Sequence, residues 1–297
     1  MKQVVNQGIL DVVDLILADY EDERTINKIN IHNQPDKEAI IDVVGKLLKI
    51  LYPGYYSDNV YKIYSLKNNM SATIEDVIFR LKKQIVLVLN YCSSDDFASE
   101  SELDAKADQI VLDFMHKIPS IRETLETDVI AGYEGDPAAA SKDEIIFSYP
   151  GFHAISIYRM AHELFLLGVP MIPRIMTEYA HSITGIDIHP GATIGKYFFI
   201  DHGTGIVIGE TTIIGEHVKI YQGVTLGGLS TKGGQSLSGK KRHPTIGNNV
   251  TIYSGASILG GETVIGDDVV IGGNTFIISS VEAGKRVSMG KQELKFS

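Results

Sequence analysis

The sequence predicts an α+β protein in two parts, an all-helical N-terminal domain followed by a parallel β-helix. Apolar residues in the first half recur at helical spacing, whereas isoleucine and leucine in the second half recur every sixth residue. Most of the 29 glycines lie after residue 184, where the second pattern begins. We therefore expect a helical domain over 1–184, a β-helix over 185–280 and a C-terminal tail over 281–297.

Helical patterns cover most of the N-terminal part. The segment 36–52 stops before Pro53 and Gly54, which cannot continue a helix. The segment 71–89 opens with Ser71, a suitable N-cap residue. The remaining expected helices span 4–20, about 101–117, 119–133, 151–167 and 172–183.

The period of six fits neither an amphipathic helix nor a meander of antiparallel strands. In a parallel β-helix, each group of six residues forms one short strand and one corner of a three-sided coil. The aliphatic residue points inward, and the glycine that often follows it permits a tight corner. The inward positions are Ile188, Ile194, Ile200, Ile206, Ile208, Ile214, Ile220, Leu226, Ile246, Ile252, Ile258, Ile265, Ile271 and Ile277.

An insertion at about 228–243 interrupts the repeat between Leu226 and Ile246. A scaffold does not need such a loop, so an inserted loop often carries function. The loop ends in a cationic cluster that includes Arg242 and His243, although the chain as a whole is acidic. The cluster favours an anionic ligand or a substrate carboxylate, and a disordered excursion is the alternative.

Composition limits the class of protein. The net charge of −10 argues against a nucleic-acid binder, which needs a broad basic face. The single cysteine, Cys92, excludes an internal disulfide and fits a reducing cytoplasm. It ends an apolar run, so we expect it to be buried.

No apolar run approaches the roughly 18 residues that span a bilayer, and the N-terminus shows no cleavage-site pattern. We expect a soluble cytoplasmic protein.

Among the nine histidines, His202 differs because it interrupts the repeat and follows Asp201. Asp187 precedes His202 by slightly less than one coil, and neighbouring coils stack about 4.8 Å apart. We therefore expect the Asp187 and His202 side chains to meet on one edge. A carboxylate that accepts from one imidazole nitrogen leaves the other nitrogen free as a base. The alternative is that these residues form only the polar edge of a scaffold.

Several segments are shared with one enzyme family. The β-helix carries "DIHPGATIG", "DHGTGIVIGET", "GVTLGG" and "RHPTIG". Upstream lie "DPAA" at 136–139 and "GFHAISIYRMAHEL" at 151–164. Together these segments resemble the serine O-acetyltransferases, hexapeptide-repeat acyltransferases of bacterial and plant cysteine biosynthesis. The resemblance implies a left-handed β-helix and acetyl transfer from acetyl-CoA to the hydroxyl of L-serine.

The resemblance also implies roles for single residues. His202 would be the general base, and Asp187 would orient it and stabilise its protonated form. Two carboxylates, Asp136 and Asp201, would hold the ammonium of serine. Arg242 and His243 would receive its carboxylate.

Acetyl-CoA is implied as co-substrate, with no permanently bound cofactor and no metal. Backbone groups near Gly228, Ser254 and Gly273 match family positions that contact the pantetheine arm of CoA, in a groove between neighbouring β-helices. The chain departs from the family at Val270, where a lysine is usual, and in its longer insertion.

Further expectations concern partners. We expect a homotrimer through the β-helix, or a dimer of trimers, with L-cysteine as a feedback inhibitor that competes with serine. Relatives bind cysteine synthase through a C-terminal isoleucine, but this chain ends in Ser297 after Lys285, Arg286, Lys291 and Lys295. Serine buries little apolar area, so we expect weak or absent binding to cysteine synthase. We expect no nucleic-acid or membrane partner.

Three rival functions remain open. Another hexapeptide acetyltransferase acting on homoserine or a sugar would share the coil and a catalytic histidine. A β-helical carbonic anhydrase would need clustered histidines, typically including two that are five residues apart, and no two histidines here have that spacing. A structural β-helix without activity is the third.

Overall fold

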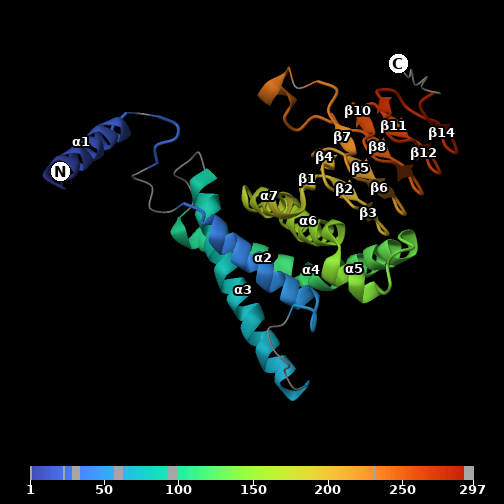
Figure 1. Cartoon of the computed structure of the whole chain (residues 1–297). Coiled ribbons are helices and arrows are strands. Elements are labelled where there is room, and N and C mark those ends of the chain that lie inside the picture. The colour runs from blue at the N-terminus through green and yellow to red at the C-terminus, as the bar shows by residue number, and fades with distance from the viewer. Residues whose placement is uncertain are drawn as a thin grey trace. The chain divides into compact units, whose positions relative to one another are not determined.

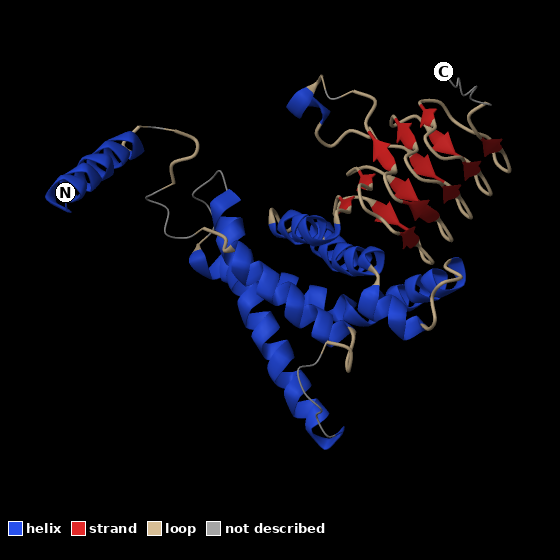
Figure 2. Cartoon of the chain, viewed as in Figure 1, coloured by secondary structure: helices blue, strands red, loops and turns tan. Residues whose placement is uncertain are grey.

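A computed structural model describes residues 2–22, 24–28, 34–56, 63–92, 99–230 and 232–290. Helices precede strands along the chain (Figures 1 and 2). The chain forms two compact units, Met1–Pro35 and Asp36–Ser297. The first unit contains α1 (Lys2–Tyr20), as the pattern predicts, and the side chains described within α1 are all exposed. No helix among the described residues is long and apolar enough to cross a membrane.

The helices of the second unit depart from the predictions at several points. They are α2 (Lys37–Leu51), α3 (Ile63–Cys92), α4 (Glu100–Gly135), α5 (Lys142–Ser148), α6 (Pro150–Leu166) and α7 (Ile172–Thr184). α2 ends before Pro53 as expected, but α3 begins well before Ser71, so the predicted N-cap is wrong. Cys92 is exposed rather than buried. α5 was not predicted.

The two helices expected on either side of residue 118 are one helix, α4, with Pro119 inside it. An internal proline removes one helical hydrogen bond and costs about 3 kcal/mol. Buried side chains before and after the proline, such as Phe114 and Leu125, belong to the same core. This continuous apolar face offsets the cost of the proline and keeps α4 intact.

The second half is a three-sided parallel β-helix, which confirms the predicted fold class (Figure 2). Face A contains β1 (Asp187–Ile188), β4 (Val207–Ile208), β7 (Thr225–Gly227), β10 (Ser257–Leu259) and β13 (Phe276–Ile277). Face B contains β2 (Thr193–Ile194), β5 (Ile213–Ile214), β8 (Thr245–Ile246) and β11 (Val264–Ile265). Face C contains β3 (Phe199–Asp201), β6 (Lys219–Tyr221), β9 (Thr251–Ile252), β12 (Val270–Ile271) and β14 (Arg286–Val287).

The aliphatic residues of the repeat stack inside the coil. On face A the paired inward residues are Ile188, Ile208, Leu226, Ile258 and Ile277, all of them buried. β14 pairs with β12, so strand pairing continues beyond residue 280. The insertion leaves the coil between faces A and B and contains the short helix η1 (Gly234–Leu237), drawn in orange in Figure 1.

The first coil is longer than the second. Asp187 pairs with Val207, and Val207 pairs with Thr225, so the first coil contains two more residues. The extra residues lie at the corner between β3 and β4, which includes His202. His202 has a φ of 60°, and Gly203 and Gly205 also have positive φ. This wide corner turns His202 away from the coil.

A buried ion pair attaches the helices to the coil. The Arg159 side chain of α6 donates to Asp128 of α4 at 2.7 and 2.9 Å. The same guanidinium donates to the carbonyls of Ile194 and Gly195, and the Asp128 carboxylate accepts from the backbone N–H of Phe198. These bonds tie α4 and α6 to the corner between β2 and β3, and so fix the end of α4 relative to β3.

Candidate active site

His202 projects from the corner between faces C and A, which we call the His202 edge. Its side chain is 70% exposed, whereas that of Asp201 is 12% exposed. The Nδ1 atom of His202 lies 3.6 Å from Oδ1 of Asp201, within ion-pair range once the imidazole is protonated. An exposed imidazole beside a shielded carboxylate can accept a proton from a substrate.

Asp136 lies at the C-cap of α4 and approaches the same edge. Its carboxylate accepts from the Tyr149 hydroxyl at 2.6 Å and from the Ala138 backbone N–H at 2.8 Å. The Tyr149 bond, with smaller contributions from Lys219 and His202, holds the pKa of Asp136 below its usual value. Conversely, the bond to Asp136 raises the pKa of Tyr149 to about 12. Asp136 is therefore ionised at neutral pH.

Lys219 of β6 lies at the same edge. Its Nζ donates to the Gly135 carbonyl at 2.5 Å and lies 3.5 Å from Oδ2 of Asp201. The ammonium also lies over the rings of Phe199 and Tyr221, 4.9 and 4.7 Å from their centroids. The structure thus brings Asp136, Asp201 and His202 to one edge, with the ammonium of Lys219 beside Asp201 and the backbone of Gly135.

The end of α4 reaches this edge because residue 135 is glycine. A Cβ at Gly135 would lie 2.7 Å from Cδ1 of Phe199, closer than real Cβ contacts. A larger residue would therefore push the helix end, and Asp136 with it, away from β3.

Arg242 and His243 lie at a different corner, between faces A and B, which we call the His243 edge. His243 is 8% exposed, and its Nδ1 accepts from the Thr211 backbone N–H at 3.0 Å. Burial, assisted by Arg242, lowers the pKa of His243 to about 4. The ring is therefore neutral at pH 7 and carries its proton on Nε2, where it can donate to a carboxylate. Arg242 forms an ion pair with Glu210.

The two edges lie on opposite sides of face A. No hydrogen bond or ion pair between described residues joins Asp136, Asp201 or His202 to Arg242 or His243. In one chain, the residues expected to bind the ammonium of serine therefore lie in a different place from those expected to bind its carboxylate.

Asp187 is not joined to His202 by any hydrogen bond or ion pair between described residues. Its Oδ1 lies 3.2 Å from Nη1 of Arg174, which projects from α7 and also pairs with Glu178. The expectation that Asp187 and His202 meet therefore finds no contact within the chain. Spacing alone did not predict this arrangement, because the first coil contains two extra residues and because Arg174 of α7 lies close to Asp187.

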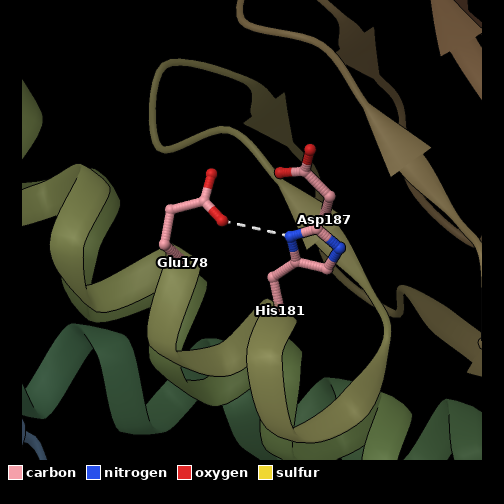
Figure 3. Close-up of side chains that lie close together, drawn as sticks. All are labelled: Glu178, His181 and Asp187. Carbon is pink, nitrogen blue, oxygen red and sulfur yellow. Dashed lines mark hydrogen bonds and ion pairs between the residues drawn. The ribbon is translucent and has the colours of Figure 1, made fainter.

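Asp187, Glu178 and His181 form the candidate metal-binding cluster of the described residues (Figure 3). Each offers one ligand atom, and these atoms lie within 4.8 Å of one another. Nδ1 of His181 lies 3.1 Å from Oε2 of Glu178, shown by the dashed line in Figure 3. Arg174 already pairs with both carboxylates, so a cation would have to compete with a fixed positive charge.

The expected CoA-contacting positions are divided between the two edges. Ser254 and Gly273 lie in coils stacked beyond His202 on its edge, where the Asn274 N–H donates to the Ser254 carbonyl at 2.8 Å. Gly228 instead begins the insertion at the His243 edge, where a Cβ would lie 3.6 Å from the Arg242 carbonyl. A ligand that contacts all three positions must reach both edges.

Two residues of the site were not predicted. Tyr149 precedes α6, and no pattern in the sequence marks it. Lys219 was identifiable, because it precedes the inward residue Ile220 and therefore faces outward, one coil above Phe199.

Comparison with known proteins identifies the family. Residues 66–157 match the family model described as serine acetyltransferase, N-terminal. The plasmid-encoded serine acetyltransferase of Synechococcus elongatus is 41% identical over 196 residues, which cover 65% of this chain and 61% of that protein. The crystal structure of serine acetyltransferase isoform 3 from Entamoeba histolytica, in complex with cysteine, is 36% identical with a TM-score of 0.73, covering 86% of this chain and 83% of that one.

The chain belongs to the serine acetyltransferase family. A further serine acetyltransferase structure, a complex with CoA, is 25% identical with a TM-score of 0.53 and covers 84% of this chain and 95% of that one. The chain spans less than two thirds of the length of the Synechococcus relative. Membership of this family confirms the resemblance that the sequence motifs of the helical part and of the β-helix indicate.

Proposed function

We propose that this chain transfers the acetyl group of acetyl-CoA to the hydroxyl of L-serine, giving O-acetyl-L-serine and CoA, in cysteine biosynthesis. The observation that carries the proposal is the exposed His202 beside Asp136 and Asp201 on one edge of the coil. Related enzymes have been solved with cysteine and with CoA, which share functional groups with the two proposed substrates.

In the proposed reaction, His202 removes the proton of the serine hydroxyl as the oxygen attacks the thioester carbon. The carbon–sulfur bond then breaks, and the CoA thiolate takes from the imidazolium the proton that came from serine. A positioned base contributes about 10²–10⁴-fold to such a step. The thiolate is a good leaving group, so the proposal includes no metal and no permanently bound cofactor.

Two carboxylates are proposed to support His202. Asp201 lies beside its Nδ1 and stabilises the imidazolium. Asp187 remains the proposed orienting carboxylate by resemblance alone, because here it pairs with Arg174. To orient His202, Asp187 must leave Arg174.

Serine is proposed to bind through both of its charges. Its ammonium contacts Asp136 and Asp201, and its carboxylate contacts Arg242 and the Nε2 of neutral His243. Because these pairs lie on different edges of one coil, we propose that the site forms where the His202 edge of one copy meets the His243 edge of another. Repeating that contact around a threefold axis gives a homotrimer, and two trimers give the hexameric alternative.

The same arrangement suits acetyl-CoA. Ser254 and Gly273 of one copy and Gly228 of its neighbour would line a groove between two coils. Val270 lies on face C in β12, where the family usually has a lysine, so CoA binding here would rely on backbone groups.

We also propose that L-cysteine inhibits by competing with serine, since it carries the same ammonium and carboxylate. The expectation about cysteine synthase depends on the C-terminal residues of the sequence. Lys285 and Arg286 are described, whereas Lys291, Lys295 and Ser297 lie outside the described residues. A cytoplasmic location is proposed from the single cysteine.

An assay of free thiol tests the function. The purified full-length chain is given acetyl-CoA with L-serine, L-homoserine or a sugar in turn. The proposal expects CoA release with serine and little with the others. Equal or faster release with a sugar or homoserine would overturn the assignment of the acceptor. Inhibition by L-cysteine that is unaffected by serine concentration would indicate a separate cysteine site.

A further inference from the structure

Lys219 contacts both sides of the acidic group on the His202 edge. It donates to the carbonyl of Gly135, the residue immediately before Asp136, and lies 3.5 Å from Asp201. Its side chain is 21% exposed and is held between Phe199 and Tyr221. A flexible surface lysine would not be confined by so many contacts.

We propose that Lys219 is a positioning residue that sets the spacing and the charge of the Asp136–Asp201 pair, and thereby selects acceptors that carry one ammonium group. This inference rests on the proposed function. The lysine anchors the end of α4 to β6, so that Asp136 stays opposite Asp201. The serine ammonium then meets two fixed carboxylates.

Charge balance supports this role. Asp136 from α4, Asp201 from β3 and Lys219 from β6 carry one net negative charge while His202 is neutral. A single ammonium neutralises that charge. Without the lysine, two carboxylates would share the edge with no cation, and like charges at one site drive one of them to take up a proton. A protonated acid is a poorer acceptor for the serine ammonium.

The other groups that face this edge do not supply a substitute cation. Tyr149 donates to Asp136 and carries no charge, because its pKa is raised to about 12. Glu144 of α5 acts on Tyr149 from further away and is itself acidic. Within the described residues around these two carboxylates, Lys219 is the permanently charged cation.

A purely structural role for Lys219 is the alternative, and the chain offers a matched control. Lys196 also joins the coil to α4, through an ion pair with Glu123 at 2.8 Å, but on another corner. Its side chain is 43% exposed. Lys196→Met therefore removes a contact between the coil and α4 while leaving the Asp136–Asp201 pair untouched.

The test compares Lys219→Met, Lys219→Arg and Lys196→Met with the wild-type chain, all at full length. Methionine keeps the apolar stem between the two rings and removes the charge. We expect Lys219→Met to raise the KM for serine about tenfold, as expected for a lost charge-assisted contact, with kcat changed by less than about threefold. The KM for acetyl-CoA should not change. Lys219→Arg should recover much of the serine KM, and Lys196→Met should match the wild type.

Each other outcome has a definite meaning. A serine KM unchanged in Lys219→Met overturns this inference while leaving the proposed function intact. An equal rise in Lys196→Met, or a fall in kcat with a raised KM for acetyl-CoA, assigns Lys219 a structural role and also overturns it. A wild-type chain that does not acetylate serine overturns the proposed function and this inference with it.

Discussion

The Tyr149 hydroxyl donates a 2.6 Å hydrogen bond to the Asp136 carboxylate, joining the residue before α6 to the end of α4. This bond is the largest cause of the lowered pKa of Asp136. It keeps the carboxylate ionised as the pH falls, and an ionised carboxylate is what the proposed ammonium site requires.

Tyr149→Phe should therefore weaken serine binding, most of all at low pH. The substitution removes the donor, so the pKa of Asp136 rises toward its ordinary value and protonation begins at higher pH. We expect the ratio of mutant to wild-type serine KM to increase as the pH is lowered from 6 to 4, toward the ordinary carboxyl pKa of 3.8. Steady-state kinetics at several pH values measures it. A constant ratio, or an effect confined to acetyl-CoA, would contradict this role for Tyr149.

Gly135→Ala tests the close approach of α4 to β3. At an exposed helix position, glycine to alanine stabilises by about 0.5–1 kcal/mol. At Gly135 the added methyl meets the ring of Phe199, and such overpacking costs roughly 1–3 kcal/mol. We expect a lower free energy of unfolding and a raised serine KM. Gly45→Ala is the control, because Gly45 is exposed in α2 with open space around it. Equal stability of the two variants would show that the contact is unimportant.

The buried Asp128–Arg159 pair should be essential for stability. Asp128→Ala leaves the Arg159 charge buried without its partner, which costs about 3–5 kcal/mol. Urea unfolding measures the change. Glu123→Ala, which breaks the exposed pair with Lys196, should have no measurable effect. Similar losses in both variants would contradict the claim that burial decides the importance of these pairs.

Sequence periodicity predicted the coil because each strand is specified by residues that are close together in the sequence. Each inward aliphatic residue specifies one strand, so the pairing of Ile200 with Ile220 follows from the pattern alone. The contacts of Asp187 did not follow, because Arg174 reaches it from a helix whose position depends on packing against the coil. The contact between Lys219 and Gly135 is of the same kind, since it joins residues 84 positions apart.

The helix predictions failed where local signals conflict with burial. Pro119 ordinarily ends a helix, yet the apolar residues on both sides share one core. Cys92 ends an apolar run but lies at the exposed end of α3. Packing against residues that are distant in sequence decides whether the helix continues at Pro119 and whether the side chain of Cys92 is buried.

A mixing experiment tests whether the site is shared between copies. His202→Ala and Arg242→Ala should each be far less active than the wild type. If the two edges meet between copies, every mixed trimer contains one site with both edges intact. Co-expression in equal amounts should then restore about a quarter of the wild-type activity. No recovery, with mixed trimers verified by mass spectrometry, would place the complete site within one chain.

The most direct test of the central claim is the turnover of His202→Ala with L-serine and acetyl-CoA. His217→Ala is the control, because His217 also has positive φ at a corner of the coil. It stacks on Tyr197 at the corner between faces B and C, and not at the His202 edge with Asp136 and Asp201. We predict that His202→Ala lowers kcat by about 10²–10⁴-fold while the dissociation constant of acetyl-CoA is unchanged, and that His217→Ala stays near the wild type. Near-normal turnover in His202→Ala would contradict the assignment of His202 as the base.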